Sequence, residues 1–154
     1  MRRFVAILFL IHFATSAYAQ SLATAERAPK VKALSSVTSN KEGFIYMGFI
    51  HSTSQPCKLT TRAIIQALAP IDNISLVLFT REQPQSYATW LNKLKDSGVA
   101  IYPNAKNIFK KYGVDYAPLG VILDAMRRVL WFGNPQSLSS EEIVKIINKW
   151  TSQR

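Results

Sequence analysis

Ser54 and Cys57 are the two side chains whose types and spacing could do chemistry together. They end the segment Ser54-Gln55-Pro56-Cys57, which follows an apolar run and precedes a run with helical periodicity. Because proline suits a first helical position, Cys57 is expected in the first turn of a helix that starts at Pro56. Unpaired N–H groups and the positive dipole end stabilise an anion there, including a thiolate. Cys57 is the only cysteine, so any sulfur chemistry depends on it alone.

The elements around this segment favour a strand followed by a helix. Residues 44–50 form an apolar strand, and the helix is expected to end at Leu68, before Pro70. Side chains at Cys57, Thr61, Ile64 and Leu68 share one side of such a helix, which places the sulfur on the inward face. Ser54 is positioned to cap the helix. A lone cysteine is also commonly a buried small hydrophobe, so a structural role stays open.

The rest of the chain continues in the same alternating manner. Gly113 is expected to end one helix, Pro118 stands directly before an apolar strand, and Ser139 with Glu142 has capping-box spacing. The predicted elements are strand 74–79, helix 83–95, strand 99–102, helix 105–112, strand 119–124, a turn at 125–126, strand 128–132 and a helix after Ser139. This order predicts an α/β domain with parallel strands in its first half and a hairpin and helix at its end.

The first 19 residues have the features of a secretory signal peptide. Arg2 and Arg3 precede an apolar run from Phe4 to Phe13, and Ala17-Tyr18-Ala19 is a small-x-small cleavage site. The run is shorter than the roughly 17–25 residues of a membrane span, and no cysteine follows the cleavage site to carry a lipid. We therefore expect a periplasmic protein with no stable membrane anchor. Residues 20–40 are expected to be a flexible leader, and 41–154 the domain.

Charge and cysteine count narrow the classes of partner. Loss of Arg2 and Arg3 with the signal peptide lowers the formal net charge from +10 to +8, and the basic residues are scattered rather than clustered. This pattern favours a solvated basic surface and, with export, argues against nucleic acid. One cysteine allows no internal disulfide in an oxidising compartment, whereas an intermolecular disulfide through Cys57 stays open.

The element order, Pro56-Cys57 at the start of the first helix, and Pro118 before the hairpin together resemble the thioredoxin fold. The chain is most similar to exported TlpA/ResA-type thiol–disulfide oxidoreductases, in which an apolar strand leads into Trp-Cys-x-Pro-Cys and a helix. The resemblance covers residues 41 to 151. It implies a central mixed sheet of four to five strands flanked by helices, a cis peptide bond before Pro118, and a peptide groove. That groove would be lined by Thr53, Ser54, Pro56, Ala117 and Pro118.

The chain departs from this family where its chemistry resides. Ser54 replaces the attacking cysteine, and Cys57 keeps the place of the resolving one. A serine cannot form a disulfide, so the two-cysteine exchange cycle is unavailable. Three supporting positions also differ: Thr53 replaces the tryptophan before the motif, Gly48 stands where thioredoxins keep a buried acid, and Thr60 where ResA-like members can carry a glutamate.

Three hypotheses follow. The first is a binding or assembly module that keeps the groove and binds a periplasmic protein or peptide without a thiol. The second is a monothiol enzyme, because Ser54-x-x-Cys57 also resembles the Thr/Ser-x-x-Cys of peroxiredoxins. Arg62 or Arg128 could then stabilise the thiolate, although Ile50 stands where peroxiredoxins carry a proline. The third, metal handling, offers only His51 and Cys57, too few ligands for a tight site. No cofactor is expected.

Overall fold

A computed structural model of the chain describes residues 26–34 and 43–152. The predicted signal peptide lies outside these residues, as do 20–25 and 35–42 of the predicted leader. The described elements are η1 (Lys32–Leu34), β1 (Phe44–Ile50), α1 (Gln55–Leu68), β2 (Ile74–Thr80), η2 (Pro84–Ser86), α2 (Thr89–Asp96), β3 (Ala100–Tyr102), α3 (Lys106–Lys111), β4 (Leu119–Leu123), β5 (Val129–Gly133), η3 (Pro135–Ser137) and α4 (Ser140–Thr151). The predicted order of helices and strands is confirmed.

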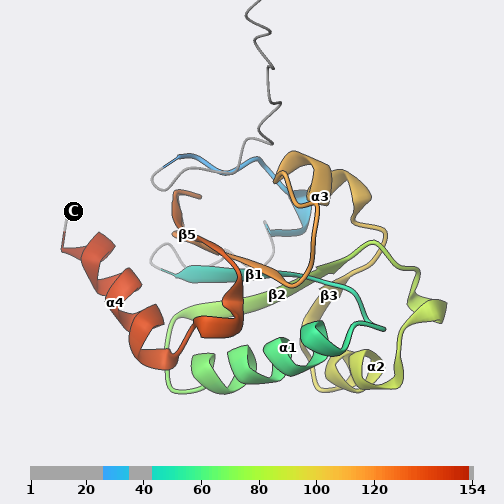
Figure 1. Ribbon diagram of the computed structural model, residues 1–154. Coiled ribbons are helices and arrows are strands. Elements are labelled where there is room, and N and C mark those ends of the chain that lie inside the picture. Colours follow the sequence, from blue (N-terminus) through green and yellow to red (C-terminus); the bar gives the residue numbers. More distant parts are fainter. Residues whose placement is uncertain (1–25, 35–42, 153–154) are drawn as a thin grey trace, which may run out of the picture.

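A five-stranded mixed sheet, ordered β3-β2-β1-β4-β5, is the centre of the fold. β1 pairs in parallel with β2, and β2 in parallel with β3. β4 runs antiparallel to both β1 and β5. Helices α1 and α2 lie on one side of this sheet and α3 on the other (Figure 1). The expected mixed sheet flanked by helices is therefore confirmed.

Alternation along β1 explains how the sheet buries both faces. Ile45, Met47 and Phe49 point into a core shared with Phe109 and Tyr112 around α3. The intervening positions face the other way: Tyr46 packs with α1 and α4, and Ile50 with the start of α1. Because successive strand residues point to opposite faces, an uninterrupted apolar strand covered by helices on both sides is expected to sit centrally.

The prediction of one continuous helix over 83–95 is wrong. A short 3-10 turn, η2, comes first, and α2 begins only at Thr89. Tyr87 and Ala88 between them are extended, with ψ angles of 138° and 150°. The Ala88 N–H donates to Ser52 Oγ at 3.0 Å, and Tyr87 is buried. These tertiary contacts outweigh the helical periodicity, which is a weak local preference.

Residues 26–34 also differ from the flexible leader that we expected. Arg27 forms an antiparallel bridge with Arg128, next to the hairpin. Ala28 and Leu34 are buried in the core on the α3 side, and Tyr112 Oη donates to the Pro29 carbonyl at 3.2 Å. This segment is part of the folded domain because Ala28 and Leu34 are buried in the same cluster as Phe109 and Tyr112.

Candidate functional site

Cys57 lies in the first turn of α1 and is fully buried, with 0% of its surface exposed. It packs in a cluster with Ile50, Leu78, Tyr87 and Leu91. The backbone N–H of His51 donates to its sulfur at 3.4 Å. The inward orientation predicted from the helical stripe is confirmed. In this conformation a partner thiol has no access to the sulfur.

Ser54 occupies the N-cap of α1 and is only partly buried. Its backbone is extended, with φ −80° and ψ 119°, and its Oγ accepts the Cys57 N–H at 3.4 Å. The predicted cap is confirmed. The site therefore presents a hydroxyl at the outer position, one turn before a thiol that is hidden. Among the described residues this hydroxyl contacts the Cys57 N–H, which cannot act as an activating base.

The loop before β4 reaches the same region. The Ala117–Pro118 peptide bond is cis, as expected. Ala117 packs against the cluster around Cys57, whereas Pro118 is buried and lines a cavity of about 10 Å³ beside β1 and α1. Of the five residues predicted for a peptide groove, Thr53 and Pro56 are exposed and Ser54 and Ala117 are partly buried. Pro118 can contribute only from beneath.

Glu82 organises this end of the sheet, and the sequence analysis missed it. It lies two residues after the last residue of β2 and accepts two hydrogen bonds of 2.6 Å from Ser52, one from the backbone N–H and one from Oγ. Thr80 Oγ1 donates to it at 2.8 Å. Ser52 in turn accepts the indole N–H of Trp90 at its carbonyl, 2.6 Å away. The carboxylate therefore fixes the turn between β1 and α1 against β2 and α2.

These contacts also set the ionisation of the cluster. Burial opposes the charge of Glu82, but hydrogen bonds from Ser52 and Thr80 and the nearby His51 hold the pKa of its carboxyl below the usual value. Burial and then the charge of Glu82 raise the pKa of Tyr87. The Tyr87 hydroxyl is the one buried side-chain polar atom without a partner in the part of the chain that the structure describes.

His51 does not form a catalytic relay with these groups. Its Nδ1 lies 3.0 Å from Thr53 Oγ1 and 3.7 Å from Glu82 Oε1. A relay needs the acid and the nucleophile on opposite nitrogens of the ring, whereas here both lie beside one nitrogen. The arrangement holds the turn in place rather than activating Thr53.

The arginines considered as thiolate partners point elsewhere. Arg128 Nε binds Asp124 at 2.7 Å, and its guanidinium lies 5.8 Å from the Trp150 ring centroid, in the hairpin and α4 region. The role suggested for Arg128 is therefore wrong. Arg62 is exposed and lines a hollow between α1 and α2. Within 26–34 and 43–152, no three His, Cys, Asp or Glu side chains gather to hold a metal.

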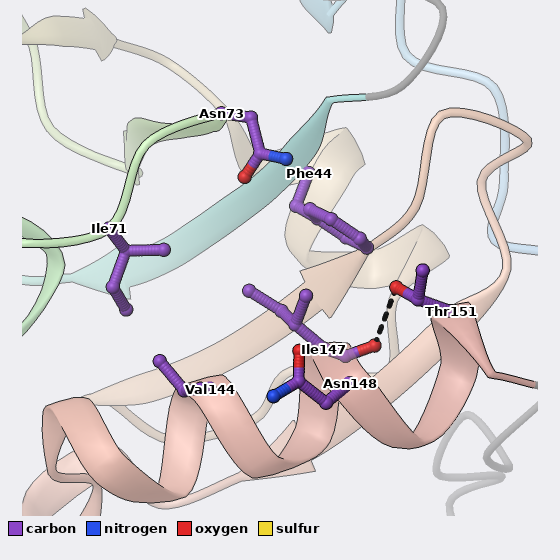
Figure 2. A pocket seen from close by; sticks show the side chains of 7 residues that line it. All are labelled: Phe44, Ile71, Asn73, Val144, Ile147, Asn148 and Thr151. Atoms are coloured by element: carbon purple, nitrogen blue, oxygen red, sulfur yellow. Dashed lines mark hydrogen bonds between the residues drawn. The ribbon is translucent and has the colours of Figure 1, made fainter.

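A larger hollow of about 440 Å³ lies away from this site (Figure 2). It is bounded by Phe44 at the start of β1 and by Val144, Ile147 and Asn148 of α4. Phe44 is the first residue of β1 and Ser52 follows its end, so the two regions lie at opposite ends of this strand. The hollow is thus not part of the candidate site. None of the described helices is long and apolar enough to cross a membrane.

Comparison with known proteins supports the fold alone. No protein-family model matches the chain, and no curated protein matches it. A thioredoxin-like protein from Parabacteroides distasonis is similar in structure, with a TM-score of 0.65 and 11% identity over 83% of this chain and 96% of the other. The thioredoxin domain of a thiol-disulfide oxidoreductase from Bacteroides vulgatus gives 0.65 and 12%, over 84% and 99%. A peroxiredoxin-like protein from Aquifex aeolicus gives 0.63 and 14%, over 84% and 88%. The fold is thioredoxin-like.

Proposed function

We propose that this chain is an exported, periplasmic thioredoxin-like protein that binds a protein or peptide and does not exchange disulfides. One observation carries the proposal: the only thiol is fully buried, at 0% exposure, while the outer position of the motif holds Ser54. Disulfide exchange starts with attack by an accessible thiolate on the substrate disulfide, which releases one substrate thiol and forms a mixed disulfide. A second cysteine of the same chain then attacks the mixed disulfide and releases the other substrate thiol. Neither requirement is met by Ser54 and Cys57.

What remains at this end of the sheet is a surface that can accept an extended chain. Thr53 and Pro56 are exposed, and Ala117, partly buried in the loop before β4, packs against the cluster that contains Cys57. Backbone hydrogen bonds to such a surface need no thiol. The network of Glu82, Ser52 and Trp90 keeps the turn rigid, which lowers the entropy lost on binding.

The alternative is a monothiol enzyme that uses Cys57. The N–H of His51 that points at the sulfur favours it, since a donor and a helix N-terminus both stabilise a thiolate. The burial of the sulfur among apolar side chains opposes it. A peroxide or disulfide substrate could reach Cys57 only if the start of α1 moved.

Thiol labelling separates the two. The native mature protein is treated with a maleimide, and Ser54→Cys is assayed for insulin disulfide reduction with Cys57→Ser as control. We expect slow labelling of the native thiol, of the order of its rate of unfolding, and reductase activity only in Ser54→Cys. Rapid labelling of native Cys57, together with peroxide consumption that Cys57→Ser abolishes, would establish the monothiol enzyme instead.

A further inference from the structure

The hollow between α1 and α2 is the strongest unassigned feature. It measures about 350 Å³ and is lined by Lys58 and Arg62 from α1 and by Thr89, Trp90, Lys93 and Leu94 from α2. The two helices lie next to each other on one side of the sheet (Figure 1). Its volume falls within the range of roughly 300–1,000 Å³ found for ligand sites.

The charge of this hollow is of one sign, and no carboxylate in the described part of the chain pairs with it. Lys58, Arg62 and Lys93 supply three cations, and no acidic residue lines it. In the described part of the chain the ion pairs involve His51–Glu82, Arg128–Asp124 and Lys145–Glu141, so none of these three cations has a carboxylate within 4.0 Å. A concave surface lined by one charge concentrates oppositely charged groups.

The hollow also has a fixed apolar part. Trp90 cannot swing freely because its indole N–H is bonded to the Ser52 carbonyl at 2.6 Å. Leu94 and Trp90 both pack against the cluster that contains Cys57, so their outer surfaces form a firm wall. A rigid aromatic surface beside basic side chains can bind a peptide that carries both apolar and acidic residues. A free anion would contact the basic side chains and leave the apolar wall without a partner.

We propose that Lys58, Arg62, Lys93 and Trp90 form a docking groove for an acidic peptide segment of a partner protein. This inference rests on the proposed binding function, and it names the chemistry of the partner. The groove includes Lys58, which directly follows Cys57 in the first turn of α1, the same turn that carries Pro56. A peptide lying across the start of α1 would place its acidic side chains between α1 and α2.

The test uses fluorescence anisotropy of two short fluorescein-labelled peptides with the mature protein. One is rich in glutamate with interspersed leucine, and the other carries glutamine in place of each glutamate. We expect salt-dependent binding of the acidic peptide and much weaker binding of the neutral one. Lys58→Glu/Lys93→Glu should weaken the acidic complex by about tenfold or more, because two attractions become repulsions.

Lys30→Glu/Lys106→Glu is the matched control. Both lysines are exposed, they lie outside the groove, and the change in net charge is the same. We expect this variant to keep its affinity. Equal losses in the two variants, or equal binding of the neutral peptide, would overturn the groove as a specific site.

A thymidine oligonucleotide tests the competing class of partner. Tighter binding of the oligonucleotide than of the acidic peptide, with loss in Lys58→Glu/Lys93→Glu alone, would replace the peptide by nucleic acid. The labelling of Cys57 on the same preparation separates this inference from the proposed function. An unreactive thiol with no affinity for the acidic peptide refutes the groove only, whereas a reactive thiol refutes the proposed function whatever the peptide does.

Discussion

Ser54 and Cys57 stand one helical turn apart and meet different surroundings. Ser54 caps α1 from outside its first turn, whereas Cys57 is the first residue of the inward stripe that continues through Thr61, Ile64 and Leu68, all buried. Exposure at a motif is therefore set by which side of the helix each position takes. A hydroxyl at the outer position and a buried thiol at the inner one leave a surface for contact and no accessible thiol at this motif.

Glu82→Gln should destabilise the protein at pH 7 by about 1–3 kcal/mol. Both carboxylate oxygens accept hydrogen bonds from Ser52 and Thr80, whereas the glutamine amide has only one oxygen that can accept them. The pKa of Glu82 is lower in the folded state than in the unfolded one. Its contribution is therefore present above the unfolded pKa and is lost as the pH falls through the folded pKa. Urea unfolding between pH 7 and pH 3 should show the difference from wild type shrinking in acid.

Glu141→Gln is the control for Glu82→Gln. Glu141 pairs with Lys145 at 2.8 Å, but both side chains are more than two-thirds exposed, at 79% and 71%. Such a surface pair contributes little. A cost for Glu82→Gln that is the same at pH 3 as at pH 7 would show that the carboxylate charge is not what holds the turn.

Glu82 belongs to no local motif that would predict its role. Its partners come from 2 and 30 residues away, and only the parallel pairing of β1 with β2 brings Ser52 to it. One signal was present: a lone carboxylate at the carboxyl end of a buried parallel strand, the edge where α/β sheets place their sites. Ser54 and Cys57 could be predicted as site residues because they lie three positions apart in one short segment.

Gly48 of β1 and Gly120 of β4 are directly opposite each other in the sheet. A Cβ on Gly120 would lie 2.5 Å from Tyr46 Oη and 2.9 Å from the Trp131 ring. A Cβ on Gly48 would lie 2.7 Å from Leu78 Cδ2. The two glycines thus make room for aromatic side chains between the sheet and α1. The space that an acidic side chain would need at Gly48 is filled by Leu78.

Gly120→Ala should therefore lower the free energy of unfolding by about 1–3 kcal/mol through overpacking. The measurement is urea unfolding in a double-mutant cycle with Tyr46→Phe, which removes the hydroxyl that the new methyl would strike. We expect part of the loss to be recovered in the double variant, as a coupling between neighbours. Strictly additive effects would mean that the backbone shifts and Tyr46 is not the obstacle.

The β4–β5 hairpin depends on Asp124, which is 1% exposed. Its Oδ1 accepts the N–H groups of Met126 and Arg128, at 2.9 and 2.8 Å. Asp124→Ala would leave these donors unpaired and should cost about 2–4 kcal/mol. Urea unfolding measures this, with the exposed Asp115→Ala as control. A loss no larger than that of the control would show that water replaces the carboxylate at the turn.

More of the overall fold than of the candidate site could be predicted from the sequence. Apolar strands 44–50 and 74–79 and the stripes of α1 and α4 depend on periodicities that a single sequence carries, and the mixed sheet was expected from their order. The failures were of another kind. The break at Tyr87 and Ala88 and the packing of residues 26–34 arise from contacts with distant residues, Ser52 and Arg128 among them. The local sequence pattern does not indicate contacts between residues that are far apart in the chain.

Residues 26–34 contribute to the stability of the whole domain. A chain that begins at residue 43 should be less stable than one that begins at residue 26, by about 2–5 kcal/mol, because the buried Ala28 and Leu34 would be lost and the α3 side of the core uncovered. The urea m-value should fall as well, since less surface is exposed on unfolding. Equal midpoints and m-values for the two chains would mean that residues 26–34 add no stability to the domain. Maleimide labelling of Cys57 in the shorter chain should speed up only as far as its unfolding does, because the thiol itself is covered from the α1 and α2 side of the sheet.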